Sequence, residues 1–173
     1  MHDVLPPPMS LKVLRHLIAG LTILVVDDNS HMRKITRTML TNLGAKSVFE
    51  ASDGISALDT IRSADPDVMV MDWEMPGLSG PDVLRIIRSP EVSPKPALPV
   101  IVLTPFPQRR CVTEAIQLGA HEFLVKPTSP KALHDRLISI IAKPRPMVRL
   151  GQYYVPLPRD PLVRRTLLGR SAA

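Results

Sequence analysis

Hydrophobic positions in the middle of the chain alternate between two periodicities. Short apolar runs predict strands, and four of the five runs are unbroken, which is typical of strands buried on both faces of a parallel sheet. Between them, apolar residues recur at the three- and four-residue spacing of amphipathic helices. The predicted strands cover Thr22–Val26, Ser47–Ala51, Val68–Met71, Val100–Leu103 and Glu122–Val125.

A helix is expected after each of these strands. The first begins at Asn29–Ser30, which are good N-cap residues, and ends at Gly44, which suits the C′ position. The other four begin near Asp53, Gly80, Gln108 and Ser129. Five strand–helix units predict an α/β fold in which a doubly wound, five-stranded parallel sheet carries helices on both faces.

Charge divides the chain of 173 residues into three parts. The formal net charge is +6, yet residues 21–142 carry 13 Lys and Arg against 14 Asp and Glu. Residues 143–173 carry seven Lys and Arg against Asp160 alone, so the basic character belongs to this segment. We therefore expect an N-terminal extension (1–20), one domain (21–142) and a basic, Pro-rich, extended C-terminal arm (143–173).

The C-terminal arm holds five prolines, which exclude a continuous helix, and it is too short to form a second core. Its apolar side chains would be costly in water, so we expect it to dock. Three arrangements stay open: an arm exchanged between copies in a homodimer, an arm bound to an acidic kinase or nucleic acid, or a tail folded back on its own domain or disordered. The residues expected in a dimer contact are Tyr153, Tyr154, Val155 and Leu157.

The N-terminal extension and the cysteine content bear on location. The stretch "SLKVLRHLIAG" predicts a short amphipathic helix, and Met9 is an alternative start of the chain. The single cysteine, Cys111, favours a reducing compartment. No apolar run approaches the ~20 residues that cross a bilayer. We therefore expect a cytoplasmic protein that does not contact the membrane.

Candidate chemistry gathers where the predicted strands end. Ligands of such sheets bind beyond the carboxyl ends of the strands, where this chain has Asp27–Asp28, Asp72, Thr104 and Lys126. Paired carboxylates resist burial unless something positive meets them, and three of them suit Mg²⁺. An ammonium and a hydroxyl nearby fit an anion, so the set is suited to accepting a phosphoryl group. The alternative is that Asp27–Asp28, together with Asn29, only cap the first helix.

Four motifs in order carry a family resemblance: "VVDDN", "VMVMDWEMPGLSG", "PVIVLT" and "GAHEFLVKP". With them, residues 21–142 resemble the receiver domain of two-component response regulators, the CheY-like family. The resemblance implies a flavodoxin-like strand order of 2-1-3-4-5. It also implies a stand-alone, Mg²⁺-dependent response regulator rather than an enzyme. Such a protein takes its phosphoryl group from a sensor histidine kinase or a histidine phosphotransfer protein and acts through protein partners.

The resemblance also implies a role for each matching residue. Asp72 would be the phosphoacceptor, and Lys126, aimed by a cis peptide to Pro127, would bind the phosphoryl group with Thr104. Phe123 would follow Thr104 inward as a switch, although an aromatic residue inside a strand also suits the core. The residues implied to hold Mg²⁺ are Asp28 directly, Asp27 mostly through water, Asp72, and Glu74 through its backbone carbonyl.

Departures from the family pattern surround the site. Pro105 and Phe106 follow Thr104, where the family usually has a small residue, and Phe106 and Trp73 are expected at the site entrance. They predict unusual rates of phosphorylation or dephosphorylation.

Two other classes of function fit the sequence less well. A haloacid-dehalogenase-like phosphotransferase would need an aspartate where Glu74 stands. A DNA-binding regulator would have to use the basic arm, which is too short and too rich in proline for a helix-turn-helix, so a nucleic-acid partner is disfavoured.

Overall fold

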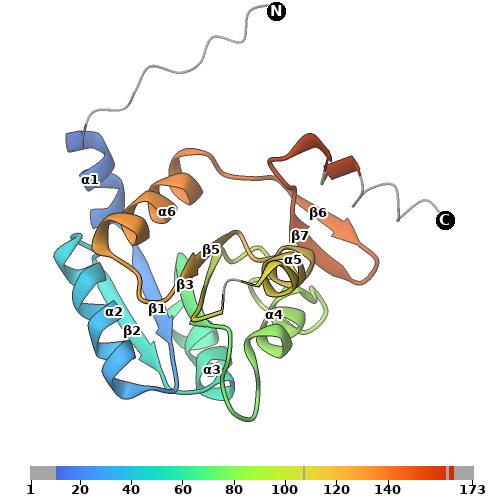
Figure 1. The fold of residues 1–173 in the computed structure, drawn as a ribbon, viewed down its shortest axis with the longest axis horizontal. Coiled ribbons are helices and arrows are strands. Elements are labelled where there is room, and N and C mark those ends of the chain that lie inside the picture. The colour runs from blue at the N-terminus through green and yellow to red at the C-terminus, as the bar shows by residue number, and fades with distance from the viewer. Residues whose placement is uncertain (1–10, 107, 163, 166–173) are drawn as a thin grey trace, which may run out of the picture.

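The predicted α/β architecture is confirmed by a computed structural model, which describes residues 11–106, 108–162 and 164–165. Five parallel strands form one sheet in the order β2-β1-β3-β4-β5 (Figure 1). This is the strand order that the resemblance implied. The strands are β1 (Thr22–Val26), β2 (Ser47–Ala51), β3 (Val68–Asp72), β4 (Val100–Thr104) and β5 (Glu122–Val125).

Helices cover both faces of this sheet. Side chains of α2 and α6 belong to one buried cluster, and side chains of α3, α4 and α5 belong to the cluster on the opposite face. An additional helix, α1, lies within the predicted N-terminal extension and packs against α6. Met9, the alternative start, lies outside the described residues. The helices are α1 (Leu11–Ala19), α2 (Ser30–Asn42), α3 (Gly54–Ala64), α4 (Gly80–Arg88), α5 (Arg109–Gln117) and α6 (Pro130–Ala142).

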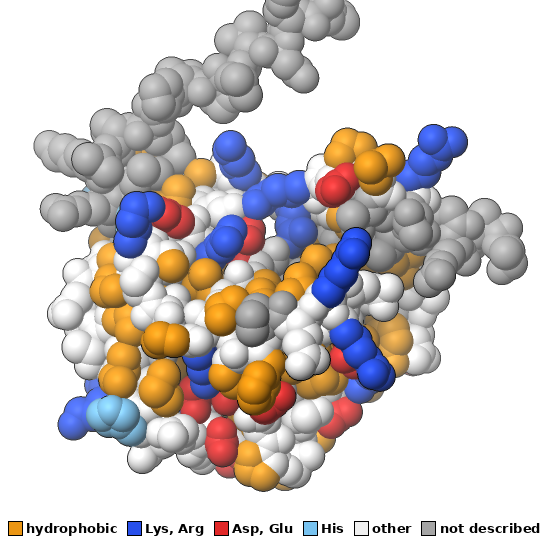
Figure 2. All heavy atoms as spheres, viewed as in Figure 1, with side chains coloured by type: hydrophobic (Ala, Val, Ile, Leu, Met, Phe, Trp, Pro, Cys, Tyr) orange, Lys and Arg blue, Asp and Glu red, His pale blue; other side chains and the backbone are white. Residues whose placement is uncertain are grey.

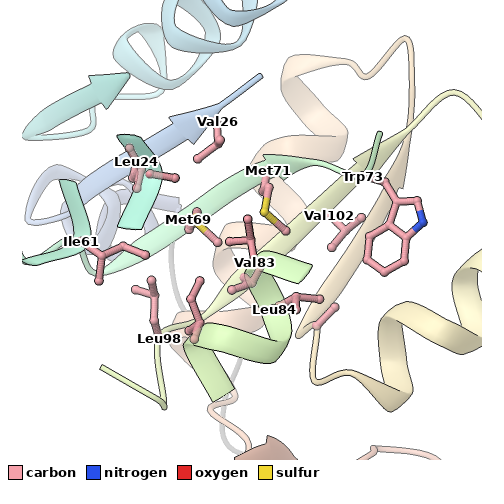
Figure 3. Close-up of a cluster of buried hydrophobic side chains, with 14 of the residues drawn as sticks. Leu24, Val26, Ile61, Met69, Met71, Trp73, Val83, Leu84, Leu98 and Val102 are labelled. Atoms are coloured by element: carbon pink, nitrogen blue, oxygen red, sulfur yellow. The ribbon is translucent and has the colours of Figure 1, made fainter. Parts of the chain in front are cut away.

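The unbroken apolar runs of the central strands are explained by burial on both faces. Every residue of β3 and β4 is buried. Alternate residues point to opposite helix layers, so Met69 and Met71 join the cluster that contains Val83 of α4 (Figure 3). Val70 joins the cluster beneath α2 and α6. A strand with no solvent face has no place for polar residues until it ends.

The described part of the C-terminal arm, called the C-terminal extension from here on, contains a hairpin that folds back on the domain. Strands β6 (Met147–Leu150) and β7 (Tyr153–Pro156) pair in antiparallel fashion, and β7 lies against α4 (Figure 1). Val155 is 2% exposed. Of the three arrangements left open, the described part of this segment adopts the folded-back one. Val155, which we expected in a dimer contact, is instead buried within its own chain.

Arginine side chains fasten the extension to the edge of the sheet. Nη1 of Arg159 donates to Oε1 of Glu122 over 2.9 Å and to Oγ of Ser139 over 2.6 Å. Arg145 donates to the backbone carbonyls of Ala120 and His121. The extension therefore covers part of the region around β5. None of the helices in the described ranges is long and apolar enough to cross a membrane.

Candidate functional site

Five side chains from the ends of four strands meet at one edge of the sheet. The strand ladders set their positions, because Asp72 of β3 pairs with Leu103 of β4, and Thr104 pairs with Val125 of β5. The N–H of Lys126 then donates to the carbonyl of Thr104 over 2.8 Å. Strands β3 and β4 each continue one residue past the predicted end, so Asp72 and Thr104 are fixed by ladder hydrogen bonds rather than held on a loop.

Three carboxylates converge in this site. One oxygen each from Asp27, Asp28 and Asp72 lies within 4.8 Å of the other two. Asp27 is 2% and Asp72 is 6% exposed, whereas Asp28 faces solvent. Oδ1 of Asp72 is buried and has no hydrogen-bond partner among the described residues. A buried, unpaired carboxylate oxygen is costly, so this oxygen set fits a hard divalent cation of the Mg²⁺ type.

Lys126 provides the positive charge within the site. Its Nζ lies 2.7 Å from Oδ2 of Asp27 and 3.1 Å from Oδ2 of Asp72. Burial disfavours the ammonium, but the hydrogen bond to Asp27 and the charge of Asp72 outweigh it and raise the pKa of Lys126. Burial disfavours the charged form of Asp72 too and therefore raises the pKa of Asp72, while the charge of Lys126 opposes that shift. The ammonium therefore stays charged and holds the two carboxylates together.

The turn after β1 shows that the paired aspartates are not helix caps. The side chain of Asn29 caps α2 by accepting hydrogen bonds from the N–H groups of His31 and Met32. Oδ1 of Asp27 accepts from the N–H of Asn29 over 2.9 Å, which fixes the carboxylate toward the site. Of the three residues in the capping alternative, Asn29 provides the cap, whereas the Asp27 carboxylate contacts Lys126.

Sequence reasoning missed Arg33, which supports the same turn. Its Nη1 donates to the backbone carbonyl of Asp27 over 2.7 Å, and its Nε lies 3.5 Å from Oε1 of Glu50 on β2. Arg33 lies only six residues after Asp27, in the first turn of α2. This closeness in the sequence is the signal from which the contact could have been predicted. Its ion pair with Glu50 depends on the pairing of β1 with β2.

Thr104 and Phe123 lie on adjacent strands. Thr104 is fully buried, and its Oγ1 accepts a hydrogen bond from the N–H of Phe106 over 3.2 Å. Phe123 is half-buried and packs against the cluster beneath α3, α4 and α5. Its packing agrees with the core alternative and leaves the switch role a prediction. The Lys126–Pro127 bond is cis.

The two aromatic residues expected at the entrance occupy different environments. Phe106 is 49% exposed, as an entrance residue should be. Trp73 is only 5% exposed and belongs to the buried cluster (Figure 3), so its indole is part of the core rather than an exposed gate. The backbone of Trp73 is also held against α4, because the N–H of Gly80 donates to the carbonyl of Trp73 over 3.1 Å. A Cβ at Gly80 would lie 2.8 Å from that carbonyl oxygen.

Known proteins are similar to this chain in sequence and in fold. The sequence profile of the response regulator receiver domain matches residues 23–138. Chemotaxis protein CheY-3 of Vibrio cholerae is 38% identical over 124 residues, which cover 72% of this chain and 94% of that protein. Chemotaxis protein CheY of Pseudomonas aeruginosa is 38% identical over 121 residues, which cover 70% of this chain and 96% of that protein.

Solved structures give the same result. Chemotaxis protein CheY4 of Vibrio cholerae superposes with a TM-score of 0.63 at 29% identity, covering 68% of this chain and 96% of that one. A response regulator described as putative, from Chloroflexus aurantiacus, superposes with a TM-score of 0.65 at 28% identity, covering 72% of this chain and 99% of that one.

Proposed function

The chain belongs to the response regulator receiver domain family, and we propose that it accepts a phosphoryl group on Asp72 in a Mg²⁺-dependent reaction. One observation carries this proposal. Oδ1 of Asp72 has no hydrogen-bond partner among the described residues, while Oδ2 lies 3.1 Å from Nζ of Lys126. The Asp72 carboxylate thus lies between an ammonium and a carboxylate cluster suited to a cation, which is a setting that supports a carboxylate nucleophile.

Phosphoryl transfer needs little covalent chemistry from the protein beyond this nucleophile. The donor is a phosphohistidine of a sensor histidine kinase or a histidine phosphotransfer protein. A carboxylate oxygen of Asp72 forms the new O–P bond as the N–P bond breaks, and the imidazole nitrogen keeps the electron pair. Asp27, Asp28, Asp72 and the backbone carbonyl of Glu74 would hold Mg²⁺, which neutralises charge on the transferred group when bound.

The chain's own cation and hydroxyl act on the phosphoryl oxygens. Lys126 already contacts Asp72, so its ammonium can move to a phosphoryl oxygen with little displacement. Thr104, at the end of the neighbouring strand, supplies a hydroxyl donor. We propose that Thr104 moves toward the phosphoryl group and that Phe123 follows it inward, which changes the surface around β5.

The output of such a protein is a change in binding to other proteins, so we propose a signalling role in the cytoplasm rather than turnover of a metabolite. The homodimer stays a prediction. Because Val155 is buried in its own chain, a dimer contact through the extension would rest on Tyr153, Tyr154 and Leu157, which are only half-buried.

Mass spectrometry after incubation with acetyl phosphate and Mg²⁺ tests the phosphoacceptor. We expect one added phosphoryl group per chain, its loss in Asp72→Asn, and no loss in Asp59→Asn, whose carboxylate pairs with Arg62 on the surface of α3. Equal labelling of the Asp72→Asn variant would contradict the assignment. Continuous hydrolysis of small phosphomonoesters would instead support a phosphotransferase of the haloacid dehalogenase type.

A further inference from the structure

An open cavity of about 370 Å³ lies between α5, β5, α6 and the C-terminal extension. It shares no lining residue with the carboxylate site: Asp27, Asp28, Asp72, Thr104 and Lys126 all lie outside it. Figure 2 shows Lys and Arg side chains gathered between α6 and the extension. The cavity is therefore a distinct feature with its own chemistry.

Three guanidinium groups line this cavity, and a single carboxylate pairs with them in the described part of the chain. Arg159 and Arg136 approach the two carboxylate oxygens of Glu122 at 2.9 and 3.5 Å. Arg145 donates to the backbone carbonyls of Ala120 and His121 and shares the negative charge of Glu122 with the other two arginines. Asp160 also lines the cavity but forms no ion pair with them within 4.0 Å.

A fourth guanidinium lies buried beside the cavity and adds to the excess. Arg88 is fully buried and bonds to the carbonyls of Gly119 and Pro96, without a carboxylate partner among the described residues. Burial, with added repulsion from Arg145, lowers the pKa of Arg88 to about 9, which leaves it charged at neutral pH. Clustered like charges repel one another, and a bound anion relieves the repulsion.

The chemistry of the lining specifies the kind of anion. Guanidinium forks match phosphate oxygens, and a phosphate monoester carries about two negative charges at neutral pH. The rest of the lining includes apolar side chains, among them Val112, Ile116 and Phe123. Phe123 offers an aromatic face on which a flat ring can stack.

We propose that this cavity binds a small organic phosphate with a flat ring, such as a nucleoside monophosphate. Its phosphate lies against Arg136, Arg145 and Arg159, and its ring lies against Phe123. Two of the three arginines belong to the extension, beyond the residues 23–138 that match the receiver family, so the extension completes the site. The ligand contacts a residue of β5 and thereby links the site to the sheet.

Isothermal titration of the full chain with adenosine and guanosine 5′-monophosphates tests this site. We expect binding of at least one nucleotide, and weaker binding of inorganic pyrophosphate, which lacks a ring. Arg136→Gln should weaken nucleotide binding about tenfold or more, the effect of losing a hydrogen bond to a charged group. Arg136 is the useful position because its one ion pair is with Glu122, so the substitution leaves the bonds that fasten the extension intact.

Two further variants separate a ligand site from arginines that only fasten the extension. Glu122→Gln removes the carboxylate that competes with the phosphate for the arginines, and it should tighten nucleotide binding. If the arginines only fasten the extension, this substitution should give no gain in nucleotide binding. Arg62→Gln, on the surface of α3, is the matched control and should bind like the wild type. No binding of either nucleotide, or binding that Arg136→Gln and Glu122→Gln leave unchanged, would overturn the proposal.

The unphosphorylated chain is sufficient for this site. Asp72→Asn should bind the nucleotide as the unphosphorylated wild type does, because Asp72 does not line the cavity. Thermal unfolding of each variant identifies any that has lost its fold. A wild-type chain that takes no phosphoryl group from acetyl phosphate but still binds the nucleotide would therefore count against the phosphoacceptor assignment alone.

Discussion

Nζ of Lys126 lies 2.7 Å from Oδ2 of Asp27, a carboxylate 99 residues earlier in the chain. The pair joins the residue after β5 to the residue after β1, across the two strands that lie between them in the sheet. Both side chains are largely buried, with 13% and 2% of their surfaces exposed. This contact compensates the buried charge of Asp27.

Replacing Lys126 by Met should destabilise the protein. Breaking a buried ion pair by removing one partner costs about 3–5 kcal/mol, because the remaining charge stays buried. We expect a loss near the lower value, since Asp28 is exposed and water reaches the site. Urea unfolding without Mg²⁺ measures it, and Lys131→Met, which breaks an exposed pair with Asp135, is the control. Equal losses in the two variants would contradict the compensating role of Lys126.

Mg²⁺ should stabilise the folded chain through Asp28. A ligand at one hundred times its dissociation constant stabilises by about 2.7 kcal/mol, which thermal melts with and without Mg²⁺ will detect. Asp28→Asn removes a ligand at the exposed side of the cluster and should abolish most of this gain. Asp59→Asn should keep it. Equal stabilisation of the wild type and Asp28→Asn would place the metal elsewhere.

His121 should make stability depend on pH. Its Nδ1 accepts a hydrogen bond from the N–H of Val100 over 3.3 Å. Burial lowers the pKa of His121 to about 2, and the charges of Arg88, Arg145 and Arg159 add to the shift. Below pH 6.5 the unfolded chain takes up a proton that the folded chain does not, so this stability is present above pH 6.5 and declines as the pH falls.

Between pH 7 and pH 5 the loss due to His121 should be about 2 kcal/mol, from 1.4 kcal/mol per pH unit below the unfolded pKa. Urea unfolding at the two pH values measures it. His121→Gln should remove this part of the pH dependence, whereas His16→Gln, at an exposed position, should keep it. An unchanged pH profile in His121→Gln would contradict the assignment.

Gly80 should not tolerate even a methyl group. A Cβ there would lie 2.8 Å from the carbonyl oxygen of Trp73 and 2.9 Å from its Cα, and this backbone next to Asp72 cannot easily move. Gly80→Ala should cost about 1–3 kcal/mol, as overpacking does. Gly20→Ala is the control, because its Cβ would meet nothing closer than 3.8 Å. A melt of Gly80→Ala that matches Gly20→Ala would contradict this reasoning.

The oligomeric state tests the role of the extension. Light scattering of the full chain should give the mass of a dimer at low and high salt, if the half-buried aromatic residues of β7 meet a second copy. Changing Tyr153 and Tyr154 together to serine should return the mass of a monomer, while Tyr153→Phe should not. A wild-type chain that stays monomeric would remove the dimer prediction and leave the extension to its own domain.

Local sequence determined the strands, the helices and the candidate site residues. The apolar runs place every strand of the parallel sheet within one residue, and the cap signals place the start of each following helix within one residue. Strands β3 and β4 end one residue later than predicted, at Asp72 and Thr104. The backbone pairing between them continues that far, and the N–H of Trp73 donates to the carbonyl of Leu103. The hairpin was missed, although two short runs around Gly151 are a hairpin signal.

The tertiary structure alone decided how distant side chains compensate one another. Arg88 is a charged residue at the end of α4, where a surface position would be expected. It is instead fully buried, because its guanidinium donates to the carbonyls of Gly119 and Pro96. Trp73 is a core residue, and its backbone is held against α4. The sequence by itself places the carboxylates at strand ends, since strand periodicity is local. Burial and pairing depend on contacts between residues far apart in the chain, and these exist only once the layers have packed.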